Sequence, residues 1–563
     1  MSTRYTVPVL TGAILVVFFG SSGKGQGKKE PPAHHVNLPA DSTTANTSSK
    51  LPKIELPEFV ITGKEPVDLP EVSKASADEQ WVTRPSSNKG NPGIRESASP
   101  GLGDMRKSQA VFTSLGNGYN GKAQVGYGTY VTPFFDASFG NSYPSADFLL
   151  KAGYKSSEGH VANGDYRNGY ASLVGGTHLS DDAGIFSSNR VQGRVAMRGN
   201  SYRFYGSTDP ALQRTVTDFD AGLSMISSNP SMIPYTADFN IESGTLRDVS
   251  RTTETSLGFE ADGTKEVGEW ELRGSTDLWK SFYSAQSPTS DPFYAKVAAS
   301  ASYRLIGSLG VRGGLAFFLY RGSDTRTAGR LYPQVGVSWY AADNVTIYAK
   351  FEPGVQRASL LSLAGTSPYV TSDVVLRHPE QFTNFSLGAE TDVSEGMQSR
   401  VSLNYSRTDN VPVFVDRDSV GVWDVLYSGT TKILSLDGEL YARLSEADDM
   451  SASVSIRSNK NSVTGDRNPY FASFLSSMSY QHRFDLGLTL SGALQIVGSR
   501  SVDLAESRTL PAFVILNLYA EYVVVPRWSL IVTLNDLLNQ RQTMWDGYAG
   551  LQRTVSLGTS FVW

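Results

Sequence analysis

From about Lys122 to the end of the chain, apolar and polar residues alternate with a period of two. This alternation predicts β-strands that show one face to an apolar environment and the other to a polar one. The same pattern recurs between residues 434 and 444 and between residues 514 and 524, so we expect a large all-β structure. The clearest run places Leu486, Leu488, Leu490, Leu494 and Ile496 on one face and Asp485, Gly487, Thr489, Ser491 and Gln495 on the other.

The segment 553–563 predicts the strand that closes this structure. An outer-membrane β-barrel ends in such a strand, because its closing strand shows an apolar face to lipid and ends in an interfacial aromatic girdle. We therefore assign Val555, Leu557, Phe561 and Trp563 to a barrel-closing strand and to a C-terminal signal for the barrel assembly machinery. Thr559 completes this largely apolar face, which is opposed by Thr554, Ser556, Gly558 and Ser560.

The connections between the predicted strands alternate in length. Transmembrane barrels have short periplasmic turns and longer outer loops, whereas a soluble β-sandwich or propeller predicts no such strict alternation. We therefore predict a transmembrane antiparallel β-barrel of about 22 strands over residues 106–563. Short connections fall near Val525–Arg527, His482–Asp485, Ser445–Met450, Asp392–Met397 and Ala341–Asn344, and long ones at Asn535–Gln552, Ser499–Pro511, Arg457–Pro469 and Pro353–Pro379.

Residues 1–23 predict a secretory signal peptide. Arg4 supplies the positive charge, Val7–Gly20 the apolar core, and Ser21–Gly23 the small residues near a cleavage site. The apolar run is too short for a comfortable spanning helix, which needs about 20 residues. A retained N-terminal anchor is the alternative. We expect the chain to be exported and to reside in the cell outer membrane.

Residues 24–105 lose periodicity and are rich in Pro, Ser, Thr, Gly and charge. Such a segment cannot bury enough apolar surface to offset the entropy of ordering it, so we predict a disordered periplasmic linker. One apolar island interrupts the linker. Extended apolar segments of this kind commonly add as a strand to the edge of a partner's sheet. The candidate partner-binding residues are Ile54, Glu55, Leu56, Pro57, Glu58, Phe59, Val60, Ile61, Thr62 and Gly63.

The composition fits an exported barrel and excludes several kinds of chemistry. The mean hydropathy is slightly negative despite 27 Tyr, 26 Phe and 8 Trp, as expected when only alternate residues face lipid. The chain has no cysteine, which removes disulfides, thiolate metal sites and thiol catalysis. A formal net charge of −5 gives no reason to expect nucleic-acid binding. The 6 histidines, with only His34 and His35 adjacent, lack zinc-site spacing, so we predict no metal and no cofactor.

Several segments resemble the TonB-dependent outer-membrane receptors. Segment 54–63 resembles their TonB box, and 348–363 (YAKFEPGVQRASLLSL) resembles the segment in which a strand leads into an outer loop. Residues 378–390, Asn535–Asn539 and 547–558 resemble later strands and turns of the barrel. The resemblance implies that segment 54–63 pairs with a TonB-like periplasmic protein that transmits inner-membrane energy. It also implies a plug domain between this segment and the barrel. Only about 45–60 residues separate Gly63 from the first predicted strand, which is too few for a plug, so we expect a receptor barrel that lacks a recognisable plug domain.

A barrel of this size normally encloses a plugged lumen, so something must obstruct it. Inward-folded loops, bulky lumen side chains, the linker, or a separate plug or surface protein are the alternatives. Glu439, Tyr441 and Arg443 are candidates for lumen side chains, although lining a wet lumen is the simpler interpretation.

Two functions remain open at this stage. The first is uptake or passage of an unidentified substrate across the outer membrane, with energy or gating arriving through segment 54–63. The second is a plug-less degenerate receptor that acts as a surface binding or scaffold protein, with 353–379 and 535–552 as contact loops. We predict no enzyme and no catalytic residue, because no clustered His, Asp and Ser arrangement stands out. The pairs Asp181–Asp182 and Asp448–Asp449 invite a divalent ion, but solvated surface charge is the simpler interpretation.

Overall fold

The computed structural model describes residues 120–143, 145–179, 189–227, 233–286, 290–394, 396–427, 429–462 and 465–563. The predicted signal peptide, the predicted linker and the partner-binding segment 54–63 lie outside these ranges, as do the pair Asp181–Asp182 and the predicted boundary at residue 105. Within the described ranges, no helix is long and apolar enough to cross a membrane.

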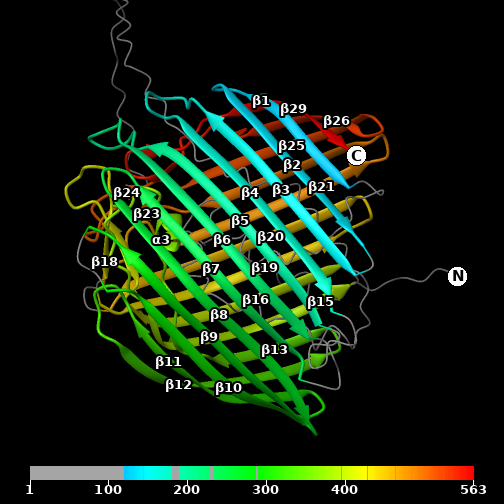
Figure 1. Cartoon of the computed structure of the whole chain (residues 1–563), viewed down its shortest axis with the longest axis vertical. Helices are drawn as coiled ribbons and strands as arrows, with labels where there is room; N and C mark the ends of the chain where they lie inside the picture. Colours follow the sequence, from blue (N-terminus) through cyan, green and yellow to red (C-terminus); the bar gives the residue numbers. More distant parts are fainter. Residues whose placement is uncertain are drawn as a thin grey trace, which may run out of the picture. The chain divides into compact units, whose positions relative to one another are not determined.

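The described residues form a closed antiparallel β-barrel (Figure 1). Its strands are β1 (Gly121–Gly128), β2 (Thr132–Ser142), β3 (Ala146–Ser157), β4 (Tyr166–His178), β5 (Asn189–Arg203), β6 (Gln213–Ser227), β7 (Tyr235–Arg247), β8 (Arg251–Val267), β9 (Trp270–Ser284), β10 (Phe293–Ile306), β11 (Leu309–Arg321), β12 (Ala328–Ala342), β13 (Val345–Phe351), β14 (Gly354–Val355), β15 (Glu380–Ser394), β16 (Met397–Asp409), β19 (Thr431–Arg443), β20 (Asp448–Asn461), β21 (Phe474–Phe484), β22 (Leu488–Val497), β25 (Phe513–Val525), β26 (Trp528–Asn535) and β29 (Thr554–Val562). Of these 23 strands, β14 continues β13 beside the same neighbour, β15, so the wall has 22 staves. Strand β29 pairs with both β26 and β1, which closes the sheet on itself.

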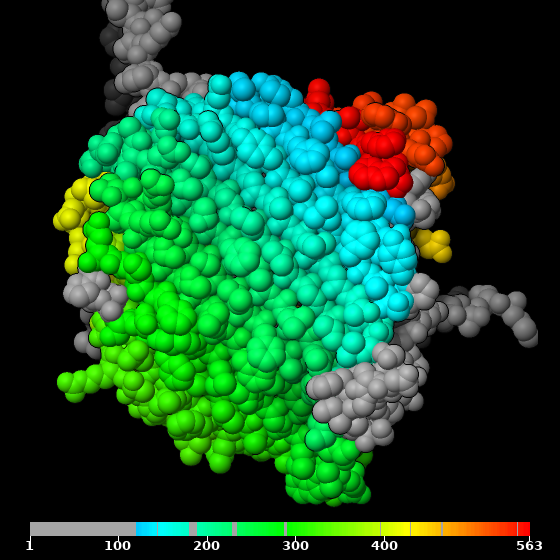
Figure 2. Space-filling view, viewed as in Figure 1, coloured from blue at the N-terminus to red at the C-terminus, as the bar shows by residue number. Residues whose placement is uncertain are grey.

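The alternation in the sequence separates lipid-facing from lumen-facing side chains. On β19, Leu434 and Leu436 are exposed on the outward face, whereas Ser435 and Asp437 face inward and share a hydrogen bond of 2.6 Å. Figure 2 shows the outward face over the strands coloured cyan to green as a continuous packed surface. Exposed leucines are costly in water but suit a hydrocarbon environment. The predicted all-β antiparallel barrel of about 22 strands is confirmed.

The two rims of the barrel differ in their connections. Strand β1 begins and β29 ends at one rim, the turn rim, where the Trp563 N–H donates to the Gly121 carbonyl at 3.0 Å. Here β8 and β9, β12 and β13, and β25 and β26 are joined by two-residue turns. The predicted alternation of short and long connections is confirmed for the connections that it named, which lie between β12 and β29, whereas the β1–β2 and β7–β8 connections at the opposite rim have only three residues each. At the opposite rim, the loop rim, longer connections contain α3 (Leu360–Thr366) and the hairpins β17 (Pro412–Val415)–β18 (Asp424–Tyr427), β23 (Arg500–Ser501)–β24 (Thr509–Leu510) and β27 (Thr543–Trp545)–β28 (Tyr548–Ala549).

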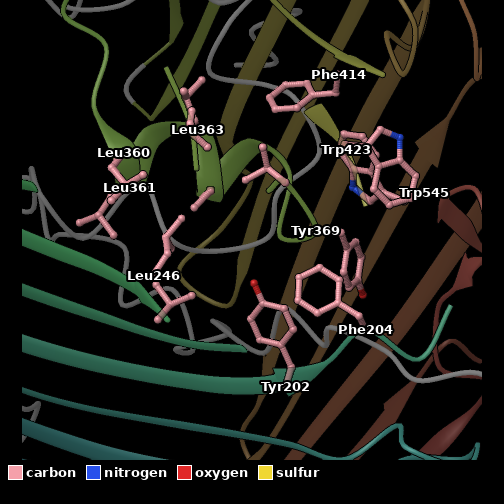
Figure 3. Packing of buried hydrophobic residues seen from close by; sticks show 14 of the residues in the cluster. Tyr202, Phe204, Leu246, Leu360, Leu361, Leu363, Tyr369, Phe414, Trp423 and Trp545 are labelled. Atoms are coloured by element: carbon pink, nitrogen blue, oxygen red, sulfur yellow. The ribbon is translucent and has the colours of Figure 1, made fainter. Parts of the chain in front are cut away.

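The largest group of buried apolar side chains in the described residues lies at the loop rim, where connections meet the inner faces of β4–β7 and β9. Figure 3 shows leucines of α3 beside Leu246 of β7, with an aromatic group around Tyr369 and Trp423 next to them. The loops are therefore folded inward and packed on the wall. The group comprises Tyr166, Tyr202, Phe204, Val216, Leu246, Tyr283, Leu360, Leu361, Leu363, Ala364, Tyr369, Val370, Val374, Leu376, Phe414, Trp423, Trp545 and Tyr548.

Candidate functional site

The connection between β14 and β15, residues 356–379, is the central element of the loop rim, and we call it the inner loop. Its two ends meet where the Gln356 N–H donates to the Pro379 carbonyl at 2.8 Å. Between them the chain forms the short helix α3, whose N-cap Ser359 accepts a hydrogen bond of 3.2 Å from the Ser362 N–H. The inner loop is therefore a compact excursion that leaves and returns to the wall at one point.

Helix α3 packs on the inner faces of β7 and β8. The Leu360 N–H at its first turn donates to Glu254 Oε2 at 2.6 Å, which satisfies a backbone group left free by the helix geometry. The other oxygen of Glu254 accepts from Ser281 Oγ at 2.8 Å. Leu361 lies over Gly244, where a Cβ would overlap its side chain. Glycine at residue 244 therefore lets the helix approach the wall closely.

Arg357 joins the base of the inner loop to β7 and β9. Its guanidinium donates to the carboxylate of Glu242, and its central carbon lies 3.6 Å from the centre of the Trp279 ring. Both partners of the ion pair are largely buried. A buried charge is tolerated only when it is paired, so removing either partner is costly.

A second buried ion pair holds the far part of the inner loop. Arg214 of β6 is fully buried and donates to Asp248, to the Pro368 carbonyl at 3.0 Å and to the Val370 carbonyl at 2.5 Å. Asp248 also accepts from Ser372 Oγ at 2.8 Å. Burial raises the pKa of Asp248, but the charge and hydrogen bonds of Arg214 outweigh it and leave the pKa below its usual value. The carboxylate is therefore ionised at neutral pH.

Wall tyrosines bind the inner loop through its backbone. Tyr202 on β5 donates to the Pro368 carbonyl at 2.6 Å, and Tyr283 on β9 donates to the Val374 carbonyl at 2.5 Å. Tyr294 on β10 donates to the Val355 carbonyl at 3.1 Å, just before the inner loop begins. The inner loop is thus attached along the wall from β5 to β10.

His378 lies near the end of the inner loop and is buried beside Tyr294 and Tyr320. Its Nδ1 accepts a hydrogen bond of 3.0 Å from the Ala358 N–H, which links the two ends of the inner loop. Burial, joined by the positive charge of Arg357, lowers the pKa of His378 to about 4. The imidazole is therefore neutral at physiological pH.

Other loops complete the closure of the loop rim. The Thr208 N–H in the β5–β6 loop donates to Val420 in the β16–β19 loop at 3.0 Å. Tyr548 in the β26–β29 loop donates to the Gly421 carbonyl at 2.8 Å and stacks on Tyr369 with ring centres 3.6 Å apart. Loops from three separate sectors of the barrel therefore meet across its mouth.

Little space remains where the inner loop meets the wall. Beneath α3 lies a cavity of about 10 Å³, lined by residues that include Glu242, Glu254 and Ser359. This is room for about one water molecule. In the stretches that the structure describes, no group of three or more His, Asp or Glu side chains is placed to hold a metal ion. The arrangement can block passage.

The predicted closing residues lie on β29 or just after it. Leu557 is 61% exposed on the outward face, and Val555 and Trp563 are also exposed. The Phe561 ring lies 6.0 Å from Trp563 and 5.0 Å from Trp528 of β26, which gives an aromatic group at the turn rim. Their role as an assembly signal stays a prediction. The segment 54–63 lies outside the described residues, so its pairing also stays a prediction.

The acidic pair Asp448–Asp449 already has protein partners. Asp449 is 3% exposed and pairs with Arg443 at 3.3 Å and Arg483 at 2.7 Å, so the interpretation as solvated surface charge is wrong for this residue. Asp448 accepts from His482 at 2.6 Å, among other donors. Arg443 pairs with Asp449 on the next stave, and Glu439 pairs with Arg400 at 3.5 Å, so both side chains lie along the wall.

Sequence reasoning missed the residues that attach the inner loop. Arg214, Glu242 and Glu254 occupy ordinary polar positions in alternating strands, and nothing in a strand pattern pairs them with a distant loop. One signal was present. The run LLSLAG within the predicted outer loop 353–379 is apolar, and an exposed loop has little use for such a run.

Comparisons with known proteins place this barrel in a family. Residues 106–537 match the family described as TonB dependent receptor-like, beta-barrel. A comparison of the sequence with curated proteins gave no match. The described residues contain the barrel and its loops, with no separate plug domain among them.

Solved structures of similar fold are transporters and receptors. The FrpB iron transporter from Neisseria meningitidis has a TM-score of 0.61 and 12% identity, over 81% of this chain and 83% of that chain. The copper transporter OprC has a TM-score of 0.57 and 12% identity, over 79% and 80%. The ferric yersiniabactin uptake receptor FyuA from Yersinia pestis has a TM-score of 0.57 and 10% identity, over 79% and 80%. At these identities the likeness concerns the fold.

Proposed function

We propose that this chain, which belongs to the TonB-dependent receptor-like β-barrel family, takes up a solute across the outer membrane through a lumen that is closed at rest. The family and the structural neighbours are transporters and receptors rather than enzymes. The neighbours are described as handling iron, copper or ferric siderophores. A solute too large for ordinary porins is the class of substrate that this comparison supports.

The observation that carries this proposal is the packed loop rim. A barrel of 22 staves has a lumen wide enough to need a plug. Here the inner loop and its neighbours occupy the mouth, so passage requires a conformational change. A lumen that must be opened suits selective uptake better than free diffusion.

Energy for that change would arrive through segment 54–63. We propose that this segment adds as a strand to a TonB-like periplasmic protein, in the β-augmentation mode of peptide recognition. Residues 1–23 would direct export, and the linker 24–105 would let segment 54–63 reach across the periplasm. The closing strand would engage the barrel assembly machinery.

The test uses the solutes that cells remove from their medium, measured by mass spectrometry. Wild-type cells should deplete at least one solute that cells without this protein leave behind. Deletion of 54–63 should abolish that depletion, whereas deletion of the equally long linker segment 91–100 should not. Both variants should give the same yield of folded barrel. Depletion that survives the loss of 54–63 contradicts energy coupling, and equal depletion without the protein contradicts uptake.

A second candidate is a surface binding or scaffold protein. The observation that favours it is the aromatic packing that joins loops from different sectors beneath the outer surface, through the buried Trp423, Trp545 and Tyr548. In this case trimming 353–379 and 535–552 should remove a surface partner without changing any solute level. Loss of solute depletion in these trimmed chains would favour uptake instead.

A further inference from the structure

We propose that the inner loop is itself the gate of the lumen and that the lumen it uncovers is cation-selective. This inference rests on the proposed function for its purpose, although its test needs no transported solute. It assigns to an internal loop the obstruction that the family assigns to a separate plug. Three observations carry it: the path of the inner loop, its weak integration into the sheet, and the charges that it covers.

The inner loop spans the mouth of the barrel. It leaves the wall at β14 and β15 and is attached to neighbouring staves as far as β5, where Tyr202 holds its Pro368 carbonyl at 2.6 Å. On its other side, Tyr369 stacks on Tyr548 of the β26–β29 loop, and the Thr371 N–H donates to the Trp423 carbonyl of the β16–β19 loop at 2.8 Å. A segment that contacts the wall on one side and loops from the other half of the ring on the other side lies between them. Figure 3 shows the helix and Tyr369 of this segment among side chains of the wall and of other loops.

The inner loop can leave without breaking the barrel. Its only strand pairing to the wall comes before it, where Gly354 pairs with Gln381 and Val355 with Glu380. All 22 staves keep their ladders if residues 356–379 move away, because the contacts described above use wall side chains. The bond between Gln356 and Pro379 keeps the two ends together, so the segment can move as one Ω-type unit once its backbone bonds to Ser323 and Trp423 in neighbouring loops break.

The closed position is the resting one. Opening would expose Leu360, Val370 and Leu376, which are fully buried when the inner loop is docked. It would also separate Arg357 from Glu242. The apolar exposure opposes spontaneous opening, whereas the separated ions regain solvation from water in the lumen. These contacts therefore keep the inner loop in place until energy is supplied or until Arg357 is replaced.

Opening also changes the charge of the wall. Arg357 lies close enough to Glu242, Glu254 and Asp277 for their charges to act on it. When the inner loop leaves, Glu242 and Glu254 lose that cation and face the lumen, whereas Asp277 keeps the charge of Lys296 nearby. Carboxylates grouped on one part of the wall favour cations over anions. A defect in the lipid has no such group, and a loss of selectivity when Glu242 and Glu254 are neutralised ties the selectivity to this part of the wall.

The experiment measures conductance of the purified full-length chain in a planar bilayer of neutral lipid in KCl. Wild-type protein should conduct rarely. Arg357→Met removes the ion pair with Glu242 by changing only the inner loop. It should raise the mean conductance at least about tenfold, with cation selectivity in a KCl gradient. The matched control is Arg377→Met, because Arg377 lies on the same loop but forms a more exposed pair with Asp324 at the rim. This control should stay near the wild-type level.

A reversible disulfide cross-link tests whether the conductance requires movement of the inner loop. Because the chain has no native cysteine, Gly244→Cys with Leu361→Cys places one thiol pair at the close contact of α3 and β7. In the Arg357→Met background, oxidation of the pair should abolish the added conductance and a reductant should restore it. Glu242→Gln with Glu254→Gln in that background should reduce cation selectivity.

Two results would overturn the gate. One is a large, steady wild-type conductance that Arg357→Met does not increase. The other is a chain lacking residues 357–378 that folds, by its heat-dependent mobility in electrophoresis, and still conducts no more than wild type. Neither result depends on segment 54–63 or on solute depletion. Failure of the gate is therefore separable from failure of the proposed uptake.

Discussion

Acidification should release the inner loop through His378. At neutral pH the imidazole is neutral and its Nδ1 accepts the Ala358 N–H. Protonation of Nδ1 removes this acceptor and places a second positive charge near Arg357, between the rings of Tyr294 and Tyr320. A released loop exposes His378 to water, where protonation carries no such penalty. Lower pH therefore favours release.

The size of the effect follows from the pKa of His378. It is about 4 when the loop is docked and 6.5 in the ordinary state, so the released form binds more protons between these values. The free energy that favours the docked loop over the released loop is therefore at its full value above about pH 6.5 and falls as the pH drops toward 4. The full difference is roughly 3 kcal/mol, of which about 2 kcal/mol is already lost at pH 5. That loss corresponds to a roughly 30-fold larger released population.

The assay uses thiol labelling in a chain that has no native cysteine. Ala364→Cys reports release, because residue 364 lies on α3 within the inner loop and is buried while the loop is docked, and Ser362→Cys is the exposed reference on the same helix. The labelling rate at 364, divided by that at 362, should rise as the pH falls from 8 to 5. His378→Asn keeps an acceptor for Ala358 without titrating and should flatten the curve. A ratio that is independent of pH, or an unchanged curve in His378→Asn, would refute this reasoning.

Three further predictions concern packing and assembly. Arg214→Met leaves Asp248 and two loop carbonyls without their buried donor and should destabilise the docked loop by about 3–5 kcal/mol in the same labelling assay; adding Asp248→Leu should recover part of this, and no recovery would mean that the ion pair is not the cause. Gly244→Ala should push α3 away from β7 and speed labelling at 364, and adding Leu361→Ala should relieve the overlap and slow the labelling again. Additive effects of the two substitutions on the labelling rate would argue against direct contact. Deletion of Trp563 should lower the yield of heat-modifiable barrel in outer-membrane fractions more than Trp528→Ala, although both side chains belong to the same aromatic group; equal yields would remove the signal role of the terminal residue.

The barrel was predictable because lipid and lumen impose a period of two on every stave. Leu434 and Ser435 illustrate this, since each side chain follows from which face it occupies. The inner loop was not predictable, because no period governs it. Tyr202 and Pro368 are 166 residues apart, and only the closure of the ring brings them together. The apolar run from Leu360 to Leu363 was the one local sign that this loop avoids water.

The partner-binding segment and the closing strand show a second limit of prediction from sequence. Short patterns identify their residues, but their roles depend on other proteins, which a structure of this chain alone does not include. Asp449 shows a third kind of limit. A pair of adjacent acids in a predicted turn suggested exposure, but strand β20 begins one residue earlier and turns Asp449 inward toward Arg443 and Arg483. A shift of a few residues in a strand boundary thus decided whether a carboxylate is solvated or buried.

The attachment of the inner loop through its carbonyls has a consequence for variation. Tyr202, Tyr283 and Arg214 recognise backbone oxygens of residues 368–374, which every amino acid supplies. These bonds therefore form whatever side chains the stretch carries, but the buried Tyr369, Val370 and Val374 and the bond from Ser372 to Asp248 still restrict the sequence. Substitution costs least at a half-buried position such as Thr371. A lineage could change the inner loop at such a position with the surrounding barrel unaltered, and an engineer would begin there as well.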